Sequence, residues 1–197
     1  MKFSSPTAFI FIGRSGCGKG TQAKLLIDYL KEEQRGQDIL YLYTGGAFRQ
    51  LAEGTSLSSQ MVKKVTESGG RAPDFLAVWT WGSQLIGSFT GSEHLVFDGS
   101  PRSLNEARTL DTALEFYGFR ETRVIFLDVS NQWSIGRLTA RGRVDDELDD
   151  IKRRLEWYEK DVVPAVEFYK TAPDYRFLQL NGEQTIEKVH RDIIAAI

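Results

Sequence analysis

Five short runs rich in apolar residues predict β-strands, and the longer stretches between them carry the spacing of helices. The runs cover residues 8–12, 38–42, 94–97, 122–129 and 175–180. The first of them is apolar at every position, which is typical of a strand buried on both faces of a sheet. One helical stretch begins near residue 18. The others cover residues 74–89, 103–117, 131–140, 147–169 and 185–197.

Strands that alternate with helices predict an α/β fold with a parallel sheet covered on both faces. The length of 197 residues suits one compact core and is short for two independent domains. Ligands of such sheets bind at the carboxyl ends of the strands. Functional residues are therefore expected in segments 13–21, 43–49 and 98–102 and in the region that follows Val129.

Composition and charge narrow the classes of function. The chain has 25 Lys and Arg against 27 Asp and Glu, a net charge of -2, so no overall basic field exists to bind nucleic acid without regard to sequence. The single cysteine, Cys17, cannot form an intramolecular disulfide, and the N-terminus lacks the apolar stretch of a signal peptide. We therefore expect a cytoplasmic protein with neither a nucleic-acid nor a membrane partner.

The segment 13–21 reads Gly-Arg-Ser-Gly-Cys-Gly-Lys-Gly-Thr, between the first predicted strand and a predicted helix. Glycines let backbone N–H groups point inward, the helix N-terminus adds positive potential, and Lys19 adds a full charge. This combination is suited to the β- and γ-phosphates of a nucleotide. The strict phosphate-loop pattern has Ser or Thr directly after the Lys, whereas here Gly20 intervenes before Thr21.

Several motifs together resemble the adenylate kinase family of short-lid nucleoside monophosphate kinases. They are Gly-Lys-Gly-Thr-Gln at 18–22, Thr-Gly-Gly-Ala-Phe-Arg at 44–49, Asp-Gly-Ser-Pro-Arg at 98–102 and Arg-Gly-Arg-Val-Asp-Asp at 141–146. The resemblance implies a P-loop NTPase-type domain with five parallel strands in the order 2-3-1-4-5. It also implies a core of residues 1–45, 73–140 and 147–197, a small helical monophosphate-binding insertion at 46–72 and a minimal lid at 141–146.

The resemblance implies the reversible reaction ATP + NMP = ADP + NDP, most simply with AMP as the acceptor, in a monomeric enzyme. GMP, CMP or UMP as acceptor, or a nucleotide-binding regulatory protein without activity, are the alternatives. The implied catalytic residues are Lys19, Arg102, Arg141, Arg143 and Arg154. The implied ATP-binding residues are Gly16, Cys17, Gly18, Lys19, Gly20, Thr21 and Arg137. The implied acceptor-binding residues are Thr44, Arg49, Ala72, Gly99, Arg102 and Glu106.

A magnesium ion is expected next to Asp98, at the end of the third predicted strand. A buried carboxylate without a partner is costly, and Mg²⁺ bound through water would remove that cost, with Thr21 as the other residue of the site. Capping of a helix N-terminus and pairing with Lys19 are the alternative roles for Asp98. The two histidines lie far apart in the sequence and suggest no metal site of their own.

Three positions in the acceptor half differ from the family pattern. Gly46 stands where the family has Asp, Ser100 where it has an aromatic residue, and Glu106 where it has a Gln that reads the adenine edge. An ionised carboxylate can accept both N1–H and N2–H of guanine, so Glu106 would favour GMP more than a Gln would. Alternatively, Asn105 approaches the base, or Glu106 is an ordinary surface carboxylate.

Overall fold

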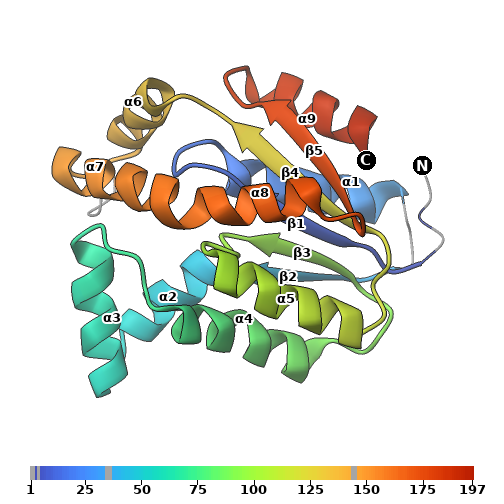
Figure 1. Cartoon of the computed structure of the whole chain (residues 1–197), viewed down its shortest axis with the longest axis horizontal. Helices are drawn as coiled ribbons and strands as arrows, with labels where there is room; N and C mark the ends of the chain where they lie inside the picture. The colour runs from blue at the N-terminus through green and yellow to red at the C-terminus, as the bar shows by residue number, and fades with distance from the viewer. Residues whose placement is uncertain (1–2, 4, 34–36, 143–145) are drawn as a thin grey trace.

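The computed structural model describes residue 3 and residues 5–33, 37–142 and 146–197. A five-stranded sheet forms its centre, in the order β2-β3-β1-β4-β5, and every neighbouring pair is parallel (Figure 1). The strands are β1 (Ala8–Ile12), β2 (Ile39–Tyr43), β3 (His94–Asp98), β4 (Thr122–Asp128) and β5 (Tyr175–Asn181). The predicted fold class and the strand order implied by the resemblance are both confirmed.

Helices cover both faces of this sheet because the central strands are apolar on both sides. Phe9 and Phe11 of β1 pack with α1 (Lys19–Glu33) and α9 (Ile186–Ala196). Ile10 and Ile12 point to the opposite face and join the larger cluster with α4 (Asp74–Ser88), α5 (Leu104–Phe116) and α8 (Val163–Thr171). This two-sided burial fixes the register of β1, so the loop that follows it is held at the carboxyl edge of the sheet.

The single helix predicted over 147–169 is wrong in one respect. The structure has α7 (Leu148–Trp157), one π-helical turn (η1, Tyr158–Val162) and then α8. The Val163 N–H reaches back five residues to the Tyr158 carbonyl, and Pro164 follows in the first turn of α8. Because proline has no N–H, it interrupts the regular helical ladder at this point, and the wider turn accommodates the interruption.

Residues 46–72, expected as an insertion, carry helical structure of their own. They include most of α2 (Thr44–Ala52) and all of α3 (Leu57–Glu67), which lie beside α4 at one end of the molecule (Figure 1). Phe48, Val62, Ala72 and Ala77 form a small hydrophobic cluster between these helices. The division into core, insertion and lid stays a prediction. The helix α6 (Asn131–Arg141) follows β4 and packs against α7.

Candidate functional site

The glycine-rich loop after β1 surrounds the ammonium group of Lys19. Gly16 and Gly18 adopt positive φ angles of 83° and 100°, which side chains other than glycine rarely tolerate. Lys19 Nζ donates to the carbonyls of Gly13 at 2.7 Å and Arg14 at 2.8 Å. The pairing of Lys19 with Asp98, one of the alternative roles for Asp98, is therefore not the arrangement found, because Lys19 Nζ donates to backbone carbonyls of the loop itself. Cys17 is buried beside it and packs into the hydrophobic cluster on the α1 side of the sheet.

Arg14 anchors this loop to the neighbouring elements, a role that the sequence did not reveal. Its guanidinium donates to the Val129 carbonyl at 2.9 Å, to Asn131 Oδ1 at 2.9 Å and to Glu159 Oε1 at 2.6 Å. It also lies 4.5 Å above the ring of Tyr158, the first residue of the π-helical turn. The loop is thus fastened to the end of β4 and to η1. In the sequence, the position of Arg14 within the glycine-rich segment 13–21 was the only indication of this role.

The glycine that follows Lys19 has a physical reason in this structure. A Cβ atom at Gly20 would lie 3.1 Å from Asp98 Oδ2, closer than ordinary van der Waals contact. Asp98 is buried at the end of β3, and its Oδ2 accepts a hydrogen bond from the Tyr41 hydroxyl at 2.7 Å. Burial, with the Asp98 carboxylate next to it, raises the pKa of Tyr41. Because Gly20 has no side chain, the Asp98 carboxylate can approach the start of α1.

The residues at this point suit Mg²⁺ held largely by water and phosphate. One carboxylate, Asp98, lies against the first turn of α1, where Thr21 is exposed. Within residues 3, 5–33, 37–142 and 146–197, no group of three or more His, Cys, Asp or Glu side chains could hold a metal ion. A site with few protein ligands is what Mg²⁺ commonly uses beside nucleotides.

Arg102 lies in the same pocket as Lys19. Gly13, Ser15 and Gly99 also line this pocket, as does Tyr158 from the π-helical turn. Arg102 Nε donates to the Gly99 carbonyl at 2.6 Å, which holds the guanidinium at the end of β3. Burial lowers the pKa of Arg102, while the nearby carboxylates of Glu106 and Asp98 oppose that effect. Lys19, expected to bind the donor, and Arg102, expected to bind the acceptor, therefore line the same pocket.

Glu106 is fully buried, so the interpretation of Glu106 as a surface carboxylate is wrong. Oε2 accepts from the backbone N–H of Arg102 at 2.7 Å, and Oε1 accepts from Trp81 Nε1 at 3.2 Å. Burial raises its pKa, although the Ser100 hydroxyl and the Arg102 N–H partly offset this. Its assignment to the acceptor base stays a prediction, and base contact would require a local rearrangement that exposes the buried carboxylate.

The other acceptor residues lie around the ends of β2 and β3. The Thr44 and Ser100 hydroxyls form a buried hydrogen bond of 2.6 Å. Arg49 is exposed on α2, and its Nη2 donates to the Tyr43 hydroxyl at 2.5 Å. Ala72 lies apart from them, 8 % exposed in the cluster between α2, α3 and α4.

Two of the expected catalytic arginines share one buried carboxylate. Arg141, at the end of α6, donates to both oxygens of Asp146 at 2.7 and 2.8 Å, and Arg154 of α7 donates to the same carboxylate at 2.7 Å. Only 1 % of the Asp146 side chain is exposed. Asp146 belongs to the quoted 141–146 motif, which was the available signal for it. Arg143 lies outside the described residues, and Arg137 is exposed on α6, 5.9 Å from the Trp133 ring centre.

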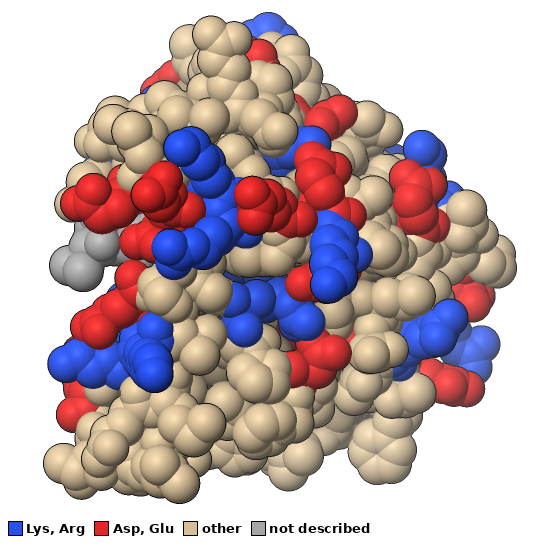
Figure 2. Space-filling view, turned by 60° about the vertical axis from the view of Figure 1, so that its left-hand side comes forward, with Lys and Arg blue, Asp and Glu red and all other residues tan. Residues whose placement is uncertain are grey.

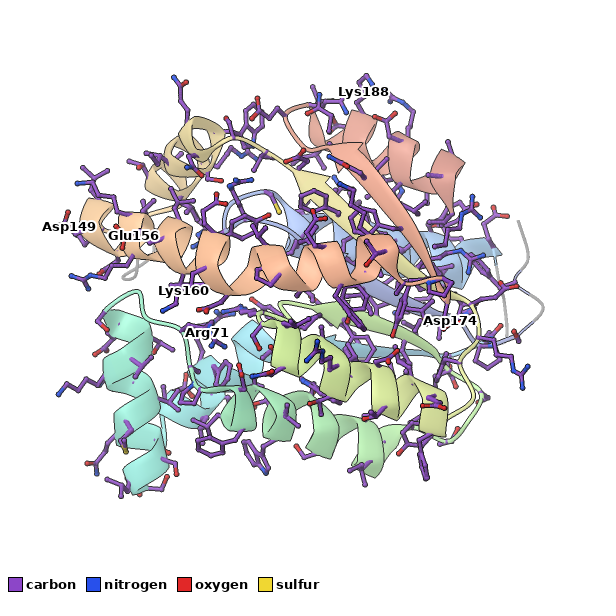
Figure 3. The ribbon with its side chains drawn as sticks, viewed as in Figure 1. Arg71, Asp149, Glu156, Lys160, Asp174 and Lys188 are labelled. Atoms are coloured by element: carbon purple, nitrogen blue, oxygen red, sulfur yellow. The ribbon has the colours of Figure 1, made fainter. Side chains whose placement is uncertain are left out.

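The end of segment 46–72 contacts the long helix above it. Trp157 Nε1 donates to the Gly69 carbonyl at 3.1 Å, and Arg153 Nη1 donates to the Ser68 carbonyl at 2.6 Å. Arg71, which precedes α4 and is labelled in Figure 3, donates from Nε to Asp161 Oδ2 of η1 at 3.0 Å. Arg153, whose side chain is 54 % exposed, therefore takes part in a contact between two segments. These bonds tie the expected insertion to α7 and η1.

The face on which α3, α6 and α7 lie is hollowed and rich in charge. Figure 2 shows Lys and Arg side chains along the hollow, with Asp and Glu side chains close to them. The chain's net charge of -2 makes such a local gathering of cations the relevant feature for an anionic ligand. No helix within the part of the chain that the structure describes is long and apolar enough to cross a membrane.

Comparison with known proteins agrees with this geometry. The family model described as adenylate kinase matches residues 11–173. Adenylate kinase 1 of Nostoc sp. is 31 % identical over 191 residues, covering 97 % of this chain and 98 % of the relative. The adenylate kinase of Hyphomonas neptunium is 34 % identical over 95 % and 96 % of the two chains, and that of Thermus thermophilus 32 % over 96 % of each. The chain therefore belongs to the adenylate kinase family of nucleoside monophosphate kinases.

Proposed function

We propose that this protein transfers the γ-phosphoryl group of ATP reversibly to AMP, giving two molecules of ADP. The observation that carries the proposal is the single pocket shared by Lys19 of the glycine-rich loop and Arg102 at the end of β3. A donor phosphate on the loop and an acceptor phosphate on Arg102 would then face each other. The relatives described above are all adenylate kinases, which supports AMP as the acceptor.

The reaction needs positioned cations more than it needs a covalent catalyst. An oxygen of the acceptor phosphate attacks the γ-phosphorus, the bond from that phosphorus to the β–γ bridging oxygen breaks, and ADP leaves. Lys19 would bind the β- and γ-phosphates, and Arg102 and Arg49 the acceptor phosphate. Arg141, Arg143 and Arg154 would stabilise the charge on the moving phosphoryl group, because planar guanidinium groups bind phosphate oxygens in pairs. Arg137 would cover the donor adenine.

Asp98 and Thr21 would hold Mg²⁺ through water next to the donor phosphates. The ion would neutralise charge on the β- and γ-phosphate oxygens. Asp98 is suited to this task because its carboxylate is buried at the strand end, beside the first turn of α1. A reducing cytoplasm, in keeping with the single cysteine, and a monomeric state complete the proposed setting.

Two residues near the acceptor site bear on which base the acceptor carries. Thr44 matches the motif of the family, which favours AMP, whereas Glu106 replaces the Gln that would read adenine. GMP, CMP or UMP therefore remain the alternative acceptors, and a regulatory protein without turnover is the alternative from another class. The intact set of cations at positions 19, 49, 102, 141 and 154 speaks against the regulatory protein.

A coupled assay of ADP formation with ATP, Mg²⁺ and each of AMP, GMP, CMP and UMP tests the proposal. We expect AMP to give the highest kcat/KM, with measurable turnover of at least one other monophosphate. A higher kcat/KM with GMP, CMP or UMP would replace AMP as the acceptor. Binding of ATP without turnover of any monophosphate would favour the regulatory alternative.

A further inference from the structure

Tyr43, the last residue of β2, occupies the space that a side chain at Gly46 would need. A Cβ atom at Gly46 would lie 2.6 Å from Cδ1 and 2.8 Å from Cε1 of the Tyr43 ring. Contacts below 3.0 Å are essentially never found for real Cβ atoms. The ring is half-buried and stacks on Tyr41, with ring centres 5.7 Å apart and planes 10° apart. Gly46 and Tyr43 therefore belong together, and a larger residue at 46 is incompatible with this ring position.

The same ring holds the guanidinium of Arg49. Arg49 Nη2 donates to the Tyr43 hydroxyl at 2.5 Å, and its Cζ lies 5.4 Å from the ring centre. Arg49 is otherwise exposed on α2, where a long side chain would sample many rotamers. One hydrogen bond and one cation–π contact restrict it to the end of β2, where Tyr43 pairs in register with Asp98 of β3.

We propose that Tyr43 is a positioning residue of the acceptor site, which holds Arg49 ready for the acceptor phosphate, and that Gly46 is required to make room for it. This inference rests on the proposed function, because it takes Arg49 as a ligand of the acceptor phosphate. Tyr43 itself transfers no proton and need not touch the substrate. Its contribution is to reduce the conformational freedom that Arg49 loses when the phosphate binds.

Tyr43→Phe tests the hydrogen bond, since it removes the hydroxyl and keeps the ring. The acceptor KM should rise about 3- to 10-fold, the typical net effect of one hydrogen bond, while kcat and the KM for ATP stay within about twofold. Tyr117→Phe is the matched control, because it removes a phenol from the far end of α5 and should change none of these constants. An unchanged acceptor KM in Tyr43→Phe would overturn the positioning role.

Gly46→Ala and the double variant with Tyr43→Ala test the shared space. Alanine is the better helix former, so Gly46→Ala should favour α2 by propensity alone. We nevertheless expect its acceptor KM to rise several-fold, because the new Cβ displaces the ring and its hydroxyl. In the Tyr43→Ala background the same change should have no further effect, which is the signature of coupled residues. Gly82→Ala, where a Cβ meets nothing within 4 Å, is the control for a helical glycine. Equal effects of Gly46→Ala in both backgrounds would contradict the coupling.

Arg49→Ala separates this inference from the proposed function. If Arg49→Ala leaves the acceptor KM unchanged, Arg49 does not bind the acceptor phosphate and the proposed acceptor site is wrong. If Arg49→Ala raises the acceptor KM and Tyr43→Phe does not, the site stands and only the role of Tyr43 fails. Thermal unfolding of each variant, compared with the wild type, excludes loss of folding as the cause.

Discussion

Asp146 offers the most quantitative test of the lid, because one buried carboxylate holds two of the proposed catalytic arginines. It accepts three hydrogen bonds of 2.7 to 2.8 Å from Arg141 and Arg154. In Asp146→Asn one carboxylate oxygen becomes an amide NH₂, which faces a guanidinium N–H and cannot accept from it. The change therefore removes the negative charge and at least one acceptor from a site where the side chain is 1 % exposed.

The expected magnitude follows from burial. Removing one partner of a buried ion pair costs about 3–5 kcal/mol, and the 8 % exposure of the Arg154 side chain places that pair in this class. Arg141 is 33 % exposed, so its share is smaller. For a chain of this size each kcal/mol lowers Tm by roughly 2–4 °C, which gives a fall of roughly 6–20 °C. The loss of orientation at both arginines should lower kcat about 10- to 100-fold.

Differential scanning calorimetry and steady-state kinetics check both effects. Asp149→Asn is the matched control, because Asp149 pairs with Lys152 at 3.3 Å but its side chain is 80 % exposed, and its Tm should change by less than about 2 °C. If Asp146→Asn keeps the Tm and the kcat of the wild type, the buried carboxylate neither stabilises the fold nor orients the arginines. A fall in Tm with an unchanged kcat would show that Asp146 stabilises the fold but does not orient the arginines for catalysis.

Three further substitutions test other parts of the site. Lys19→Met should abolish turnover with the fold retained, since no other residue of the loop carries its charge to the β- and γ-phosphates, and near-normal activity would remove the phosphate-loop interpretation. Arg102→Ala should raise the acceptor KM and lower kcat with little change in ATP affinity, and the reverse pattern would exchange the two sites. Glu106→Gln should sharpen the preference for AMP over GMP, measured as a ratio of kcat/KM values, and an unchanged ratio would show that Glu106 does not read the base. Because burial raises the pKa of Glu106, the folded state binds its proton more tightly than the unfolded state does, so this residue's contribution to stability is lost as pH rises above about 4.3 through the raised pKa, and Glu106→Gln should lack that dependence in urea titrations.

Apolar patterning predicted β1 directly, because burial of all its residues on both faces of the sheet leaves no polar position to confuse the signal. The glycine-rich loop was equally plain, since it follows such a strand directly. The helices α2 and α3 were expected only as a small helical insertion implied by the resemblance, because their apolar residues are few and pack only into the small cluster around Phe48 and Val62. The π-helical turn was not predicted, because the helical spacing of apolar residues continues through it. Pro164, in the first turn of α8, was the only sequence feature that pointed to a break in the helix.

The missed parts of the site share a physical cause, which is contact between side chains and backbone groups that only the packed structure brings together. Glu106 is held by Trp81, from another helix, so its burial could not be read from its own surroundings. Gly46, Ser100 and Glu106 looked like unrelated departures from the family. In the structure each has a local partner, namely Tyr43 for Gly46, Thr44 for Ser100 and the Arg102 N–H for Glu106. Such pairings depend on the packed structure and carry no periodic signal.

The transfer of a labelled phosphoryl group tests the central claim most directly. ATP carrying ³²P at the γ-position is incubated with AMP, Mg²⁺ and the protein, and the nucleotides are separated by chromatography. Direct transfer predicts that the label appears in ADP at the β-position, one labelled ADP for each ATP consumed, and that none of it appears before AMP is added. Label released as inorganic phosphate, or label that stays in ATP with AMP present, would contradict the account.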